Sequence, residues 1–190
     1  MNLRFKSRFQ AIMWCVSGIA LLCFAVAQIL YSRLGLEFLS VFRTTALTVF
    51  YHLAVRLVFG EWLVRGIRFE GVDYSRGWFR VRAWEMALYR RMGVQRWKGG
   101  MPTYNPEEFS MAGRSIEEIV RSTCRAEIVH EFNVIVSFLP LLFSIPFGAF
   151  MAFLLTSIAA AVFDMVFVIM QRYNRPRLIR LMQMRERRQK

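Results

Sequence analysis

The chain has 190 residues, of which 56% are hydrophobic and 18 are Phe. This apolar share exceeds the roughly 45–50% of soluble domains and predicts an integral membrane protein. The net charge of +13 would suit a nucleic-acid-binding protein, but basic residues beside membrane spans are explained by topology and anionic lipid, so no nucleic-acid partner is expected. The three cysteines form no C-x-x-C pair, which indicates neither a disulfide framework nor a zinc site.

The first predicted membrane span covers about residues 11–31. It follows the basic residues Arg4 and Lys6 and has close to the roughly 20 apolar residues that a spanning helix needs. Residues 25–27 read Ala-Val-Ala and resemble a signal-peptide cleavage site, but the apolar run continues past them. We therefore favour an uncleaved span.

The second predicted span, at about residues 44–64, contains ionisable groups. His52 and Arg56 are one helical turn apart and share a face. Charged groups within a span usually face a protein interior or a wet cavity. Alternatively, the charged half of this helix lies at the membrane interface, and the sequence leaves both interpretations open.

The polar centre, about residues 65–126, combines many arginines with Trp and Tyr, as expected for the headgroup layer of a membrane. Trp84, Leu88 and Met92 recur at helical spacing and predict a short interfacial helix. The pair Asn105-Pro106 indicates another helix start, and Ser115 with Glu118 forms a capping-box pattern that opens a helix running into the next span.

The last long apolar run predicts two spans, at about 127–146 and 149–170, with the turn near residues 144–148. Arginines concentrate at both termini and in the centre, so the positive-inside rule places these three segments in the cytoplasm and requires four spans. Residues 171–190 are predicted to form a basic amphipathic tail on the inner leaflet. The prediction is a single all-α polytopic membrane domain, residues 1–190.

The main candidate for chemistry lies where the third span begins. Glu127, His130 and Glu131 are spaced i, i+3 and i+4 and so share one helical face. A carboxylate can then orient the imidazole as a general base for a hydroxyl. Ordinary hydrogen bonds of an interfacial histidine are an alternative. A metal site would need several carboxylates from other helices, and Asp164 alone supplies one, so no metal is expected.

A second candidate site lies where the fourth span ends. Residues 171–178 read QRYNRPRL, with more specific polar groups than a stop signal needs, which indicates binding as well as anchoring.

These residues resemble a known family. The pattern R-A-E-x-x-H at 125–130, the octapeptide at 171–178, and the segments WFRVRxWE at 78–85 and YRRMGVQRWK at 89–98 are similar to the glycosyl-4,4'-diaponeurosporenoate acyltransferases. These are bacterial membrane enzymes of carotenoid ester synthesis. The resemblance covers about residues 75 to 180.

The resemblance implies transfer of a fatty acyl group from an acyl thioester, such as acyl-CoA, to a sugar hydroxyl of a glycosylated lipid in the bacterial cell membrane. The expected partners are membrane lipid, this acceptor and the acyl donor, with no further cofactor. In this hypothesis His130, oriented by Glu127, deprotonates the hydroxyl, and Arg125, Gln171 or Asn174 stabilises the oxyanion.

The remaining candidates are assigned to substrate binding. Arginines and lysines suit donor phosphates, although anionic lipid and topology also account for many of them. The predicted substrate-binding set is Glu85, Arg96, Trp97, Lys98, Gln171, Arg172, Tyr173, Asn174, Arg175 and Arg177.

Two familiar acyl-transfer signatures are missing from the sequence. Neither histidine is followed by Asp five residues later, and no G-x-S-x-G nucleophile motif occurs, which favours direct transfer over a covalent serine intermediate. A small integral-membrane methyltransferase and a non-enzymatic structural or assembly protein are the alternative functions.

Overall fold

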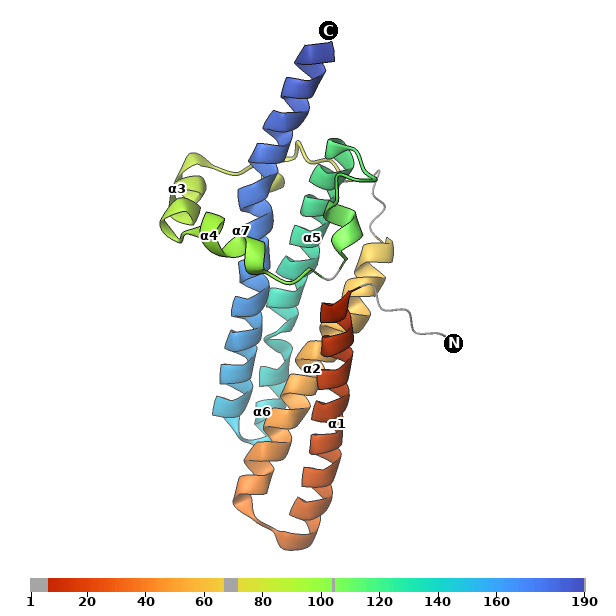
Figure 1. Cartoon of the computed structure of the whole chain (residues 1–190). Coiled ribbons are helices and arrows are strands. Elements are labelled where there is room, and N and C mark those ends of the chain that lie inside the picture. Colours follow the sequence, from red (N-terminus) through yellow and green to blue (C-terminus); the bar gives the residue numbers. More distant parts are fainter. Residues whose placement is uncertain (1–6, 67–71, 104, 190) are drawn as a thin grey trace. The chain divides into compact units, whose positions relative to one another are not determined.

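The computed structural model describes residues 7–66, 72–103 and 105–189, and every regular element among them is a helix (Figure 1). Four helical segments are long and apolar enough to cross a membrane: Arg8–Leu34, Glu37–Val58, Ile116–Phe143 and Phe150–Gln189. The predicted all-α membrane protein with four spans is therefore confirmed. Arg4 and Lys6 lie outside the described residues.

The chain forms two compact units. The membrane unit comprises Arg8–Trp62 and Phe132–Asp164, and the polar unit comprises Met1–Ser7, Leu63–Glu131 and Met165–Lys190. Each of these units combines segments that are distant in the sequence, and the single membrane domain over residues 1–190 stays a prediction. The catalytic candidates predicted from the sequence all lie in the polar unit.

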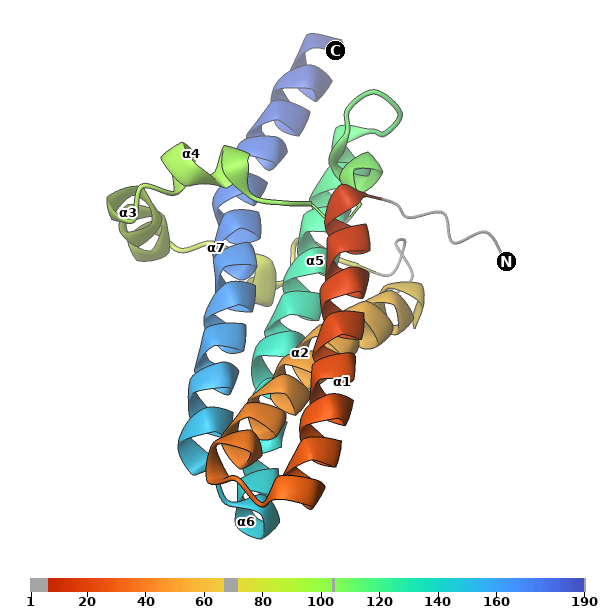
Figure 2. The same cartoon turned by 60° about the horizontal axis from the view of Figure 1, so that its bottom comes forward.

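In the membrane unit, α1 (Arg8–Leu34) and the main part of α2 (Glu37–Gly66) lie side by side as a hairpin (Figures 1 and 2). Gly35 ends α1 in the left-handed conformation, with φ 65°, and its N–H donates to the Tyr31 carbonyl at 2.9 Å. Large apolar side chains such as Leu22, which is 65% exposed, cover the outside of α1, as expected for a surface in contact with lipid.

The second hairpin departs from the predicted boundaries. Helix α5 runs from Ile116 to Val136, followed by η5 (Leu139–Phe143) and α6 (Ser144–Phe147). The turn lies at Gly148 and Ala149, both with positive φ. The predicted helix that opens at Ser115 and runs into the third span is confirmed, with its capping box formed: Glu118 N–H donates to Ser115 Oγ at 3.1 Å, and Ser115 N–H to Glu118 Oε2 at 2.7 Å.

The helix of the fourth predicted span continues beyond residue 170. Helix α7 is continuous from Phe150 to Gln189, with Pro176 inside it. The predicted basic segment after residue 170 is therefore a continuation of α7, and its place on the inner leaflet stays a prediction. Proline removes one backbone hydrogen bond, but the contacts of Arg172 and Arg175 with other elements hold the preceding turn of α7 in place.

The membrane unit also buries charge. Arg56 of α2 forms an ion pair with Asp164 of α7, and their side chains are 8% and 0% exposed. Arg56 further donates to Ser137 Oγ at 3.1 Å and to the Ala160 carbonyl at 2.9 Å. Of the two interpretations of Arg56, these contacts favour the inward-facing one.

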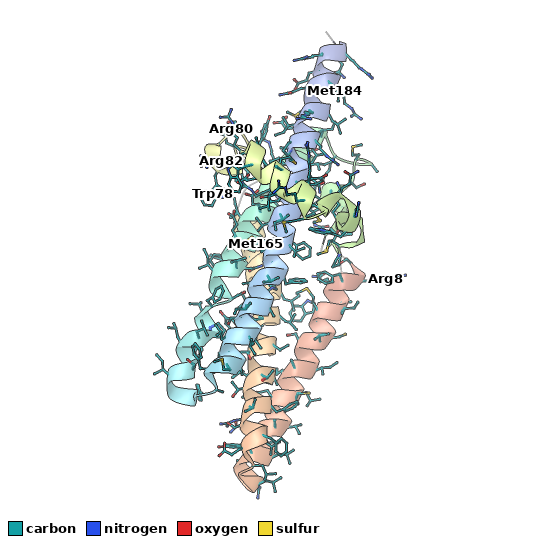
Figure 3. All side chains as sticks on the ribbon, turned by 90° about the vertical axis from the view of Figure 1, so that its left-hand side faces the viewer. Arg8, Trp78, Arg80, Arg82, Met165 and Met184 are labelled. Carbon is teal, nitrogen blue, oxygen red and sulfur yellow. The ribbon has the colours of Figure 1, made fainter. Side chains whose placement is uncertain are left out.

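In the polar unit, α3 (Ala83–Arg91) and α4 (Val94–Trp97) lie together beside α7 (Figures 1 and 2), and Gly93 joins them with φ 65°. Trp78, Arg80 and Arg82 lie together on the segment that leads into α3 (Figure 3). The expected helix after Asn105 is only a 3-10 turn, η4 (Pro106–Phe109), and η2 (Gly77–Phe79) and η3 (Lys98–Gly100) are further short turns. Tyr89 and Val94 pack with Tyr173 of α7 in a small core.

Candidate functional site

Within the polar unit, residues 123–130 of α5 and 167–175 of α7 run antiparallel in a defined register. The His130 ring of α5 stacks on the Phe167 ring of α7, with centroids 4.7 Å apart and an interplanar angle of 9°. One helical turn earlier on α5, Glu127 meets residues further along α7, and Thr123 meets Arg175. The two sequence candidates, at residues 125–130 and 171–178, are thereby in direct contact.

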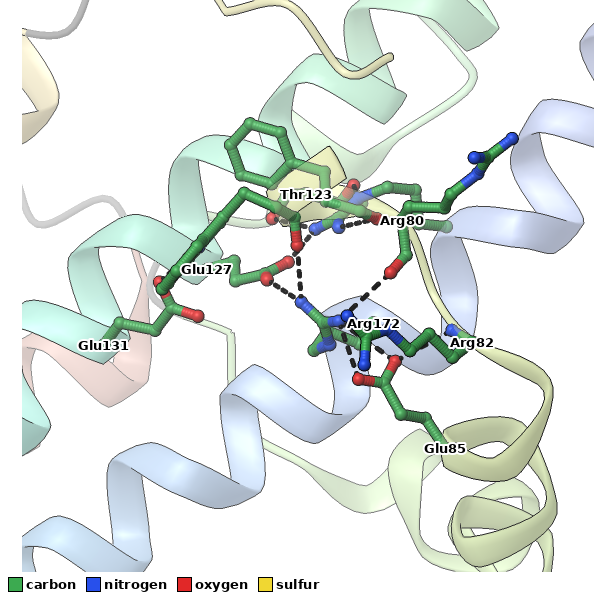
Figure 4. A network of polar contacts seen from close by, with 10 residues as sticks. Arg80, Arg82, Glu85, Thr123, Glu127, Glu131 and Arg172 are labelled. Atoms are coloured by element: carbon green, nitrogen blue, oxygen red, sulfur yellow. Dashed lines mark hydrogen bonds and ion pairs between the residues drawn. The ribbon is translucent and has the colours of Figure 1, made fainter. Parts of the chain in front are cut away.

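Glu127 is at the centre of this contact. Its side chain is 0% exposed, and its two carboxylate oxygens accept hydrogen bonds from different arginines, Oε1 from Arg172 and Oε2 from Arg175 (Figure 4). A buried carboxylate needs such partners, because removing an ion from water without compensation is very costly. Arginine, with its planar group of five donors, suits the task.

Arg175 is the more buried of the two arginines. Its side chain is 1% exposed and also donates to the Phe79 carbonyl at 3.0 Å, the Thr123 carbonyl at 3.2 Å and Thr123 Oγ1 at 3.0 Å. Its guanidinium lies 5.1 Å from the centre of the Phe79 ring. Arg175 therefore joins α7 to α5 and to the 3-10 turn at Gly77–Phe79.

Arg172 extends the network to α3. Its Nη2 lies 3.0 Å from both oxygens of Glu85 and donates to the Arg80 carbonyl at 3.3 Å, and its Nη1 donates to the Trp78 carbonyl at 3.1 Å. Glu85 in turn accepts the Arg82 N–H at 3.0 Å, which satisfies a donor at the first turn of α3. One carboxylate thus begins α3 and fixes it to α7. We call Glu85, Glu127, Arg172 and Arg175 the ion-pair network.

His130 is half-buried and lies one turn from Glu127 on the same helix. The neighbouring Glu131 accepts a hydrogen bond from Trp78 Nε1 at 2.9 Å. Both carboxylates that the sequence placed on the His130 face are therefore bound to other groups as well. Because Glu127 already accepts from two guanidinium groups, its principal observed role is that of their counter-ion.

The candidate oxyanion donors differ in their surroundings. Arg125 is bound to Glu108 at 2.8 Å, and both side chains are largely buried. Gln171 is 5% exposed and follows Phe167 by one turn, so it shares the face of α7 that stacks on His130. Asn174 accepts a hydrogen bond from Lys98 Nζ at 2.5 Å. Of the three, Gln171 has the placement that best suits a donor beside His130.

Tyr173 contacts two cations through its ring. Lys98 Nζ is 5.3 Å and the Arg177 guanidinium carbon 4.7 Å from the centre of its ring, and Arg177 donates to the Tyr173 hydroxyl at 2.8 Å. Burial, followed by the charge of Arg177, lowers the pKa of Lys98. Among the described residues neither cation pairs with a carboxylate, so their charge is uncompensated. We call Lys98, Tyr173 and Arg177 the cation cluster.

Arg96 and Trp97, also predicted to bind substrate, lie outside the ion-pair network and the cation cluster. Arg96 is exposed on α4. Trp97 is half-buried, packs against the core formed by Tyr89, Val94 and Tyr173, and donates to the Met92 carbonyl at 3.1 Å. Trp97 therefore supports the wall of the cation cluster.

Sequence reasoning missed the parts of the site that have no distinctive residue type. These are Thr123, which binds Arg175 through both its hydroxyl and its carbonyl, and the backbone carbonyls of residues 78–80. A signal was available in Arg172 and Arg175, because two arginines three residues apart on a helix require nearby carboxylates if they are buried.

Comparison with known families decides the identity of the chain. The family model for glycosyl-4,4'-diaponeurosporenoate acyltransferase matches residues 75–184, which is more than half of the chain. The chain belongs to this family. The match contains the whole ion-pair network, the cation cluster and His130. The residues that the family model matches are therefore the ones that form these contacts in the polar unit.

Comparison with curated proteins and with solved structures gave no match. The family match and the four spanning helices together identify a membrane enzyme of an acyltransferase family in carotenoid biosynthesis.

Proposed function

We propose that this acyltransferase esterifies a sugar hydroxyl of a glycosylated carotenoid-type lipid with a fatty acyl group taken from a thioester such as acyl-CoA. The polar unit and both termini lie on the cytoplasmic side of the bacterial cell membrane, where a water-soluble donor is available. The observation that supports the proposal most is the contact of His130 with Phe167 inside the segment that matches the family.

His130 is the general base in this proposal. Its imidazole takes the proton of the sugar hydroxyl as the oxygen attacks the thioester carbonyl carbon, and a tetrahedral oxyanion forms. The C–S bond then breaks, and the leaving thiolate takes the proton from the imidazolium. The products are an ester and a free thiol, so protons balance over the cycle and no covalent enzyme intermediate is needed.

Gln171 is the proposed oxyanion donor, because it lies one turn from Phe167 on the face of α7 that meets His130. A preorganised donor of this kind stabilises the charge that develops on the thioester oxygen. Arg125 has a structural assignment, since Glu108 binds it.

Lys98 and Arg177 are the proposed sites for the donor's phosphates. They are close together on the Tyr173 ring and have no carboxylate partner among the described residues, so an anion would relieve their mutual repulsion. Arg172 and Arg175 are already neutralised by Glu85 and Glu127. For these two arginines the ion pairs favour a structural role over phosphate binding.

The decisive experiment supplies both substrates to the purified full chain in nanodiscs. Labelled acyl-CoA with a glycosylated carotenoid acid is expected to give labelled ester, whereas a labelled methyl donor with the same acceptor is expected to give no product. Methyl transfer without acyl transfer would contradict the proposal. Mass spectrometry of membrane lipids from deletion and wild-type cells provides the cellular counterpart, with loss of the acylated glycolipid as the expected result.

A further inference from the structure

Trp78 is a large aromatic residue whose backbone is anchored in the polar unit while its side chain is open. The side chain is 67% exposed. The Trp78 carbonyl accepts a hydrogen bond from Arg172 at 3.1 Å, and the carbonyl of the next residue, Phe79, accepts one from Arg175 at 3.0 Å. The Phe79 side chain is buried. The indole is therefore held in a defined place although little of it packs against the protein.

The indole of Trp78 is hydrogen-bonded to a carboxylate. Its Nε1 donates to Glu131 Oε2 at 2.9 Å. Glu131 is half-buried and lies beside Glu127 at the edge of the ion-pair network (Figure 4). Among the described residues nothing donates to its other oxygen, Oε1, and no cation forms an ion pair with it. Glu131 thus keeps accepting capacity beside an accessible aromatic ring.

Trp78 and Glu131 lie near the point where the apolar run of α7 ends. Glu131 directly follows His130, whose ring stacks on Phe167 of α7. The apolar run ends three residues after Phe167, at Met170. In a membrane protein this level meets the headgroup layer. A glycolipid that is anchored by its tail carries its sugar at the same level.

The chemistry of a sugar ring matches these two side chains. The C–H groups on one face of a pyranose are slightly positive and suit the negative face of an indole. The hydroxyls around the rim donate hydrogen bonds, which are strongest to an ionised acceptor such as a carboxylate. Because Nε1–H lies in the plane of the indole, Glu131 is at the edge of the ring. A sugar packed on a face of Trp78 therefore turns its rim toward Glu131.

We propose that Trp78 and Glu131 bind the sugar of the glycolipid acceptor and so bring one of its hydroxyls to His130. Neighbouring residues have Cα atoms about 3.8 Å apart, so a sugar ring bound to Glu131 is next to the imidazole. Trp78 and Glu131 are positioning residues, and the proton transfer stays with His130. The identity of the acceptor rests on the proposed function, whereas recognition of its sugar is measured as binding, without acyl transfer.

The test compares two uncharged lipids that differ in the sugar. The full chain in phosphatidylcholine nanodiscs is titrated with a glycosylated carotenoid acid, or with the methyl ester of the same acid, and native mass spectrometry measures the bound lipid. We expect the wild type to bind the glycosylated lipid at least about tenfold more tightly, as a charge-assisted hydrogen bond implies. Equal affinities for the two lipids overturn the proposal.

Variants assign the sugar preference to these two residues. Trp78→Leu and Glu131→Gln are expected to reduce it at least about fivefold and to leave the affinity for the methyl ester unchanged. Trp78→Phe keeps an aromatic face and should retain part of the preference. Trp84→Leu is the matched control, because Trp84 is 61% exposed in the same unit and its indole has no hydrogen bond to the described residues. If Trp84→Leu reduces the preference equally, both tryptophans are interfacial anchors and the proposal is overturned.

Glu131→Gln decides the matter even where Trp78→Leu does not fold, because glutamine still accepts the hydrogen bond from Trp78. In the acyl-transfer assay this variant is expected to raise KM for the glycosylated acceptor about fivefold with KM for acyl-CoA unchanged. A rise in KM for acyl-CoA alone contradicts the sugar site.

The sugar site and the proposed function can fail separately. If the wild type prefers the glycosylated lipid through Trp78 and Glu131 but transfers no acyl group, the proposed function fails and the sugar site stands. If the wild type transfers acyl groups and both variants keep the full sugar preference, the sugar site fails and the proposed function stands.

Discussion

Arg175 donates a hydrogen bond to Glu127 where both side chains are withdrawn from solvent, with exposed fractions of 1% and 0%. Glu127 also binds Arg172, which in turn binds Glu85. A substitution of Glu127 therefore removes the shared counter-ion of Arg172 and Arg175.

Replacing Glu127 by Gln is expected to destabilise the polar unit by about 3–5 kcal/mol, because breaking a buried ion pair leaves uncompensated charge. Chemical unfolding of the purified protein in detergent measures the change. Glu117→Gln is the control, since Glu117 pairs with Arg121 on the surface of α5 and its loss should have little effect. Equal effects of the two substitutions would contradict the central role of Glu127.

His130→Ala is expected to lower the rate of acyl transfer about 10²- to 10⁴-fold, the usual contribution of a general base, while the protein keeps its unfolding temperature. Single-turnover kinetics with labelled acyl-CoA provide the measurement. Phe167→Leu is a useful companion, because it removes the stacked ring and keeps the imidazole. An unchanged rate in a stably folded His130→Ala protein would remove His130 from the mechanism.

Lys98→Ala and Arg177→Ala are expected to raise KM for acyl-CoA about tenfold each with a small change in kcat, as the loss of a charge-assisted hydrogen bond to phosphate implies. Arg96→Ala, on an exposed helix without a role in the cation cluster, should leave KM nearly unchanged. If Arg96→Ala has the largest effect of the three, the phosphate site lies elsewhere.

The affinity for CoA is expected to fall with rising pH earlier than an ordinary lysine would allow. Lys98 binds an anion only while protonated, and burial lowers its pKa. The contribution of Lys98 is therefore complete at low pH and is lost as the pH rises through this lowered pKa. Calorimetric titration with CoA, which has no thioester to hydrolyse, detects the change, and Lys98→Arg should move it to higher pH.

Single substitutions of Arg56 or Asp164 are expected to cost about 3–5 kcal/mol, whereas the double variant Arg56→Met, Asp164→Leu should recover most of the loss. Each single change strands a charge between membrane helices, and the double change removes both. Thermal unfolding in nanodiscs compares the three proteins. If the double variant instead loses as much stability as the two single variants combined, the pair contributes more than charge balance.

Strong local patterns predicted much of the fold. The capping box at Ser115 and the helical spacing of Trp84 and Leu88 correspond to observed helices, because such patterns depend on residues close in sequence. The sequence gives no local signal that α7 continues through Pro176, because proline removes a backbone hydrogen bond, and the contacts of Arg172 and Arg175 hold the preceding turn in place.

The candidate site was predicted as two groups of residues, and the hairpin of two spans between them predicted that they meet. The contact between residues 125–130 and 171–178 follows from a hairpin of two spans, which the sequence indicated. That Glu127 binds arginines depends on side-chain register between helices far apart in sequence, and no local pattern encodes it.

The ion-pair network contains two arginines and two glutamates, so its formal charge is zero. The cation cluster on Tyr173 carries two positive charges without a carboxylate partner among the described side chains. Added salt should therefore separate the two: the architecture of the polar unit would tolerate high ionic strength, while the capture of an anionic donor would weaken with it.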